Sequence, residues 1–130
     1  MHPIAALQAA LVTALEGDAA LVALIGAGGV FDAPPRSRKA PYVVTDRHET
    51  RQRDADQAPG QEHRLLLHCW SDQPSRKAAL EIAERVLAAG LVPAPSGLVV
   101  THAEHIRTET AIDNATGQAR AAVLLRFLSE

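Results

Sequence analysis

The chain has very few aromatic residues: Phe, Tyr and Trp together make up 3% of its 130 residues. A core must therefore be built from leucine, valine, isoleucine and alanine, which bury less apolar area than aromatic side chains. Such a core predicts modest stability for the monomer. It fits a subunit that gains stability by oligomerising.

The sequence also lacks a cysteine pair, a long apolar run and a strong excess of one charge. The single cysteine, Cys69, excludes an intrachain disulfide and suits a reducing compartment. No run approaches the ~20 apolar residues of a membrane span, and the start Met1-His2-Pro3 lacks the basic region of a secretion signal. The formal net charge of -2 argues against a dedicated nucleic-acid-binding protein.

The length predicts a single domain, residues 1–130. Apolar periodicity and the Gly and Pro breakers predict helices at about 3–16, 18–25 and from a cap at Asp72 or Ser75 to about 89, and strands at about 41–50, 62–70, 98–112 and 119–128. Residues 30–32 form either a short strand or an extended segment. The predicted fold class is α+β, in the order α-α-β-β-α-β-β. Its sheet is mainly antiparallel, with about four strands and with helices packed on one face.

Side-chain spacing also predicts which faces are buried. On the last strand, Val123, Leu125 and Phe127 share one face, and Leu124, Arg126 and Leu128 share the other. The inward residues of the helices near 18–25 and 75–89 are predicted to be Leu21, Leu24, Ile25, Ala79, Ile82, Ala83, Val86 and Leu87.

A polar segment, Arg51–Gly60, lies between the first two predicted strands. We predict that it is a loop, longer than the usual two to five residues of a hairpin connection. Connections of that length are typically functional or disordered. The predicted partner-binding residues within it are Arg51, Arg53, Asp54, Asp56 and Gln57.

Six histidines raise the question of a metal site. Zinc requires three or four converging ligands, whereas only a cross-strand pair, His48 and His63, is expected to meet. Neighbouring strand residues such as His68 and Cys69 point to opposite sides of a sheet, so they cannot form an activated thiolate pair. We predict no catalytic residue, no metal site and no cofactor.

The one basic concentration consists of Arg36, Arg38, Lys39, Arg47, Arg51 and Arg53. It can contact phosphate groups, or it is a solvated rim neutralised by nearby carboxylates, which is the interpretation we prefer. Trp70 ends a strand just before a helix. It either covers the edge of the core or anchors a neighbouring subunit.

Several segments, in this order, carry a resemblance to a known family. They are Ala5-Ala6-Leu7-Gln8-Ala9-Ala10-Leu11, Asp18-Ala19-Ala20-Leu21, Val30-Phe31-Asp32, Pro34-Pro35, Pro41-Tyr42-Val43-Val44 and Leu67-His68-Cys69-Trp70-Ser71 followed by an alanine-rich helix. Over nearly its whole length the chain resembles the tail-completion, or tail terminator, proteins of long-tailed phages, prophages and gene transfer agents. The residues His68 and Cys69 depart slightly from the hydrophobic strand end usual in that family.

The resemblance implies a structural protein without catalytic residues. It implies a homo-hexameric ring at the neck of the virion, assembled in the host bacterial cytoplasm, that caps the head-proximal end of the tail tube. The implied partners are the tail tube protein and the head–tail connector or stopper protein, with DNA passing transiently through the lumen and no membrane involved.

Within that ring, the sheet edges are natural subunit contacts because an unpaired edge is a template for pairing. The expected contact residues near such an edge are Trp70, Leu124, Arg126 and Leu128, and the residues expected to face the lumen are Arg36, Arg38 and Lys39. Three alternatives remain open: a head–tail connector or stopper ring, a metal-binding module using the histidines, and a monomeric ligand-binding domain.

Overall fold

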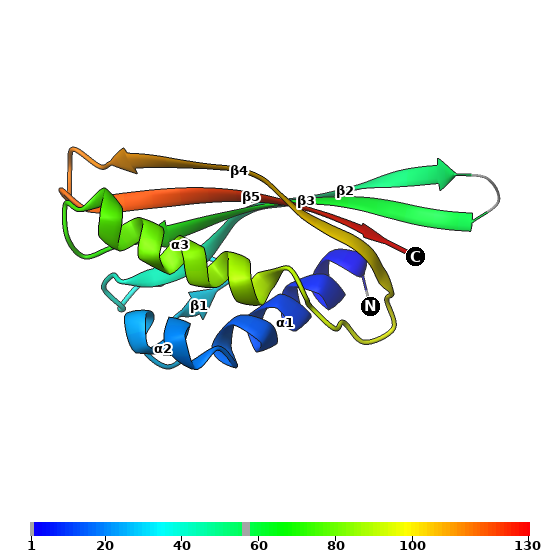
Figure 1. Ribbon diagram of the computed structural model, residues 1–130, viewed down its shortest axis with the longest axis horizontal. Coiled ribbons are helices and arrows are strands. Elements are labelled where there is room, and N and C mark those ends of the chain that lie inside the picture. Colours follow the sequence, from blue (N-terminus) through cyan, green and yellow to red (C-terminus); the bar gives the residue numbers. More distant parts are fainter. Residues whose placement is uncertain (1, 56–57) are drawn as a thin grey trace.

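The computed structural model describes residues 2–55 and 58–130. Within these ranges the chain forms three helices that cover one face of a five-stranded sheet (Figure 1). The elements are α1 Pro3–Glu16, α2 Ala19–Ile25, β1 Val30–Phe31, β2 Tyr42–Ala55, β3 Ala58–Trp70, α3 Arg76–Gly90, β4 Val100–Ile112 and β5 Ala119–Ser129. The predicted α+β class is confirmed.

The sheet has the strand order β1-β2-β3-β5-β4. All neighbouring strands are antiparallel except β1, which pairs with β2 in parallel through Val30 and Phe31. The sheet therefore has one strand more than the four predicted. A two-residue strand is too short to show a side-chain period, so only its pairing with Val43 and Val44 identifies it.

Local capping explains why the helices begin where the sequence predicts. The side chains of His2, Asp18 and Ser75 each accept a hydrogen bond from a backbone N–H in the first turn of α1, α2 and α3. Pro3 occupies the first turn of α1, where its missing N–H leaves no hydrogen bond unmade. No single helix within the described ranges is long and apolar enough to cross a membrane; only α1 and α2 together, bent by 85°, reach that length and composition.

The core lies between the helices and the inner face of the sheet. On β5, the predicted inner residues Val123, Leu125 and Phe127 are all 0% exposed, which confirms the predicted face. The leucines of α1 and the inward residues of α3 pack against them: Leu7, Leu11, Leu15, Ala79, Ile82, Ala83 and Val86. Leu87 is partly buried against the same cluster.

The prediction for Leu24 was wrong: its side chain is 37% exposed, whereas Leu21 and Ile25 are buried. The helix α2 has only seven residues. Residues one turn apart, such as Leu21 and Ile25, share the inward stripe, and Leu24 lies at its margin.

The prediction of a loop over 51–60 was also wrong. Strand β2 continues to Ala55 and β3 begins at Ala58, with paired register from Tyr42↔Trp70 to Ala55↔Ala58. We call residues 51–55 and 58–60 the arm. Figure 1 shows this hairpin extending past the rest of the sheet. A two-stranded ribbon in solvent has no buried face, so its strands need no alternation of apolar and polar residues. Its sequence is therefore polar throughout and cannot be distinguished from that of a loop.

Candidate interaction surfaces

The helices leave the opposite face of the sheet uncovered, and we call this the open face. Its central residues come from alternate positions of β3 and β5 and are half-buried: Leu66, His68, Trp70, Arg120, Leu124, Arg126 and Leu128. All four residues expected at a subunit contact, Trp70, Leu124, Arg126 and Leu128, are among them. The structure thus brings these four onto one surface, because β3 and β5 are neighbours.

Those residues do not lie at a sheet edge, contrary to the expectation for the last strand. Strand β5 lies between β3 and β4, and the edge strands are β1 and β4. Within the described residues, the outer edge of β4 carries no strand along Val100–Ile112, and β1 covers β2 only at Val43 and Val44. The chain therefore offers an open face and two partly free edges.

An ionic network orders the open face. The Arg126 guanidinium donates to Glu104 Oε1 at 2.9 Å and to Glu62 Oε2 at 3.1 Å, and its side chain is only 22% exposed. Arg64 Nε donates to Glu62 Oε1 at 2.9 Å. Hydrogen bonds from Arg64 and then Arg126 lower the pKa of Glu62, and a hydrogen bond from Arg126 lowers the pKa of Glu104. The charges of Glu62, Arg64, Glu104 and Arg126 are thus paired. The large half-buried apolar side chains of this face are Leu66, Trp70, Leu124 and Leu128.

Trp70 lies on the open face, whereas the adjacent Cys69 points into the core. The interpretation of Trp70 as a cover for the core was therefore wrong. The Arg120 guanidinium lies 5.8 Å from the centre of the Trp70 ring, and the Arg120 Nε atom is buried with no hydrogen-bond partner among the described residues.

The three basic residues of the β1–β2 connection have different environments. Arg36 and Lys39 are exposed. The Arg38 guanidinium instead donates to the backbone oxygens of Ala27 at 2.9 Å and Ile25 at 2.5 Å, and it lies 5.7 Å from the centre of the Phe31 ring. Arg38 therefore satisfies carbonyl groups at the end of α2, and only Arg36 and Lys39 present free cationic groups to solvent.

The arm presents exposed polar side chains to solvent. On its β2 side, Arg51 and Arg53 are exposed, and Arg51 Nε lies 3.9 Å from Glu49 Oε1. Two of the residues predicted to bind a partner, Asp56 and Gln57, lie outside the described residues.

The predicted contact between His48 and His63 is confirmed, with His48 Nε2 at 3.0 Å from His63 Nδ1. Within residues 2–55 and 58–130, no group of three or more His, Cys, Asp or Glu side chains could hold a metal ion. Cys69 is 0% exposed, and burial raises the pKa of its thiol to about 12. These residues show no arrangement for metal or thiolate chemistry.

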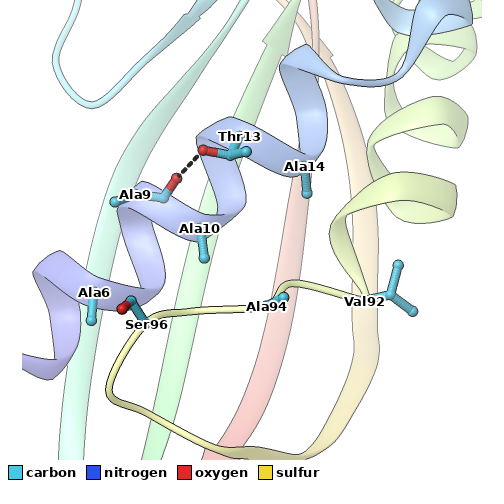
Figure 2. Close-up of a pocket in the computed structure, with 8 residues that line it drawn as sticks. All are labelled: Ala6, Ala9, Ala10, Thr13, Ala14, Val92, Ala94 and Ser96. Carbon is cyan, nitrogen blue, oxygen red and sulfur yellow. Dashed lines mark hydrogen bonds between the residues drawn. The ribbon is translucent and has the colours of Figure 1, made fainter.

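Sequence reasoning missed a shallow groove between α1 and the segment that follows α3 (Figure 2). It has a volume of about 450 Å³ and is lined by Ala6, Ala9, Ala10, Thr13, Ala14, Val92, Ala94 and Ser96. Alanines at one-turn spacing on α1 were the only signal in the sequence. The neighbouring Val92 is 75% exposed, so the rim of this groove is apolar.

Comparisons with known proteins agree on one family and one fold. The sequence matches the family described as tail completion protein gp17 over residues 9–127. The fold is similar to a chain in the virion of a native gene transfer agent particle, with a TM-score of 0.86, 25% identity and coverage of 100% of this chain and 99% of that chain. It is also similar to the bacteriophage SPP1 gp17 protein, with a TM-score of 0.62, 21% identity and coverage of 95% and 88%. Among curated proteins, no sequence match is found.

Proposed function

Because the chain belongs to the tail completion protein gp17 family, it is a structural component of a phage-type tail and not an enzyme, and we propose that it forms a closed homo-hexameric ring there. The ring would end the tail tube and join it to the connector of the capsid, with DNA passing through its lumen. The observation that carries this proposal is the family match over 9–127, together with full-length similarity to a chain of a gene transfer agent virion.

A closed ring requires a heterologous interface, in which one surface of each subunit binds a different surface of the next. The open face supplies one such surface, with half-buried Leu124 and Leu128 on either side of the paired charge of Arg126 and Trp70 farther along, beside Arg120. The free outer edge of β4 adjoins this face and extends the same contact.

The arm is the proposed contact with the tail tube protein or the connector protein. It extends past the sheet, as Figure 1 shows, and carries exposed Arg51 and Arg53. The residues proposed to bind these partners are Arg51, Arg53, Asp54, Asp56 and Gln57. A polar ribbon of this kind gives specificity through charge complementarity more than through buried apolar area.

The residues proposed to face the lumen are Arg36, Arg38 and Lys39. Only Arg36 and Lys39 are exposed, because the guanidinium of Arg38 is hydrogen-bonded to backbone oxygens. A formal net charge of -2 favours passage of DNA through the lumen over its retention there, because affinity for DNA rises with the number of phosphates that cations neutralise.

Native mass spectrometry of the purified protein, alone and mixed with the tail tube protein, tests the proposal. We expect a hexamer, either in isolation or only when the tube protein is present. A ring that ignores the tube but binds the connector would favour a stopper ring. A strict monomer that binds neither partner would exclude both assignments.

The role of the arm can be tested by shortening it. Replacing Asp54–Pro59 with Asn-Gly keeps Arg53 and Gly60 as cross-strand partners and supplies a two-residue turn that suits a hairpin. We expect the ring and the fold to persist, because the removed residues lie beyond the last β3–β5 pair, Gln61↔Ser129. Head–tail joining, measured as the yield of complete particles, should fall at least about tenfold, which corresponds to about 1.4 kcal/mol of lost binding. An unchanged yield would exclude the arm as the partner contact.

A further inference from the structure

Three polar side chains, two of them buried and one half-buried, form a cluster at the root of the arm. His63 on β3 is 0% exposed and Ser129 on β5 is 3% exposed. His63 Nδ1 lies 3.0 Å from His48 Nε2 on β2, and His63 Nε2 lies 3.1 Å from Ser129 Oγ. We call His48, His63 and Ser129 the His–His–Ser cluster. It connects three strands near the last β3–β5 pair, Gln61↔Ser129, beyond which the arm has only two strands.

The geometry indicates where the protons lie when both imidazoles are neutral. The Nδ1 atom of His48 is buried and has no hydrogen-bond partner among the described residues. Buried N–H groups without an acceptor are rarer than buried acceptors without a donor, so His48 carries its proton on Nε2. It then donates to His63 Nδ1, and His63 donates from Nε2 to Ser129 Oγ.

The surroundings of the cluster oppose positive charge. Burial, followed by the charges of His63 and His2, lowers the pKa of His48 to about 4. Burial, followed by the charge of His2, also lowers the pKa of His63. His2 belongs to the start of α1 and is the titratable group that faces the cluster from the helix layer.

No carboxylate compensates within the sheet rows around His63. In the row of His63 and in the next row of the same face toward the arm, the paired residues are neutral: Thr50, Gln52, Gln61, Val100, Ala103 and Phe127. The row on the other side runs from His48 through Leu65 and Leu125 to His105, a further titratable residue, which is exposed on β4. Three charged residues, Asp32, Asp46 and Arg47, line the open cavity beside His48. Asp46 Oδ2 lies 3.9 Å from His68 Nε2, and neither Asp32 nor Asp46 is among the charges that shift the pKa of His48.

We propose that the His–His–Ser cluster is an acid-sensitive switch that holds β2 against β3 and β5 at the root of the arm at neutral pH and releases β2 when the imidazoles are protonated. A first proton on His48 Nδ1 leaves the hydrogen bonds intact but places an unpaired charge beside His2. A second proton, on His63 Nδ1, places an N–H donor of His63 directly opposite the Nε2–H donor of His48. Two donors cannot form a hydrogen bond, so the His48–His63 bond breaks. The arm root then opens while the rest of the sheet stays paired.

The direction of the pH effect follows from linkage. Both imidazoles have a pKa below the ordinary value in the closed state, so the open state binds more protons between about pH 4 and pH 6.5. The closed state is fully stabilised above pH 6.5 and loses stability as the pH falls toward 4. With a closed-state pKa of about 4 for His48, the opening equilibrium should rise about 20-fold between pH 7 and pH 5 from this residue alone.

Hydrogen exchange of the whole protein at pH 7 and pH 5, corrected for intrinsic rates, tests the switch. We expect protection at residues 47–52, 61–65 and 126–129 to fall about 20-fold. Protection near Ile112 and Ala119, at the other end of the sheet, should not change. Equal protection at both pH values, or a uniform loss along all five strands, would overturn the proposal.

Two histidine variants test which group causes the pH dependence of hydrogen exchange at the root of the arm. His48→Gln should remove most of the pH dependence, whereas His102→Gln, an exposed histidine outside the cluster, should retain it. If His48→Gln does not fold, ¹⁵N NMR of the imidazoles in the wild-type protein provides the test. Neutral rings of His48 and His63, each protonated on Nε2 at pH 5.5, would support the switch. Ordinary titration of His48 and His63 near pH 6.5 would overturn it.

Discussion

Replacing Leu124 with glutamate is expected to leave the chain folded but to abolish ring formation. Leu124 lies at the centre of the open face, opposite Leu66 on β3 and Arg107 on β4. A shallow depression there of about 170 Å³ is lined by Arg47, Glu49, Arg64, Leu66, Arg107 and Leu124. A carboxylate placed among these guanidinium groups is tolerated in the free subunit, but it must be desolvated when the face is covered.

The expected effect on assembly is large because the same contact is repeated at every subunit interface of the ring. A truncated or charged residue at the centre of an interface costs about 2 kcal/mol or more, and a closed hexamer repeats the contact about six times, which gives about 12 kcal/mol per ring. Native mass spectrometry should show monomers where the wild type shows hexamers. The control is Leu124→Met, which keeps the apolar volume and should still assemble. Hexamers of the glutamate variant would show that the open face is not the subunit contact.

Replacing Phe127 with alanine is expected to lower the free energy of unfolding by about 3–5 kcal/mol. Phe127 is 0% exposed and is the largest fully buried side chain among the described residues. It lies on the inner face of β5, opposite His63. A chain with so few aromatic residues has little other large apolar volume to fill the resulting cavity.

Urea unfolding of a non-assembling background such as Leu124→Glu would measure this loss for the subunit alone. Because domains are stable by only about 5–15 kcal/mol, the variant should lose a large part of its stability. The control is Val92→Ala at a 75% exposed position, which should change stability by less than about 0.5 kcal/mol. A loss below about 1 kcal/mol for Phe127→Ala would show that the core repacks around the missing ring.

The helices and the faces of the last strand could be predicted because their determinants are local. The caps at His2, Asp18 and Ser75 act on N–H groups two or three residues away. The alternation of Val123, Leu125 and Phe127 with Leu124, Arg126 and Leu128 depends only on the period of a strand. The family could also be identified, because the order and spacing of short apolar segments are properties of the sequence.

Other features depend on pairing between distant segments. The polar residues of the arm continue β2 and β3 because each strand supplies hydrogen-bonding partners to the other, which composition does not reveal. Arg38 was expected to face a lumen, yet its guanidinium is hydrogen-bonded to Ile25 and Ala27, 13 and 11 residues earlier. The exposure of Leu24 likewise follows from how α2 lies against its neighbours.

The sequence by itself determined the helix boundaries, the buried face of β5 and the membership of a structural tail family, since capping, periodicity and segment order are encoded over short distances. Only the tertiary structure decided the strand order, because the pairing of β3 with β5 depends on long-range contacts that no local pattern specifies. That pairing places Leu124 and Arg126 on an open face instead of at an edge. It also brings His63 to Ser129 across 66 residues of sequence, where burial and neighbouring charge lower the pKa of His63.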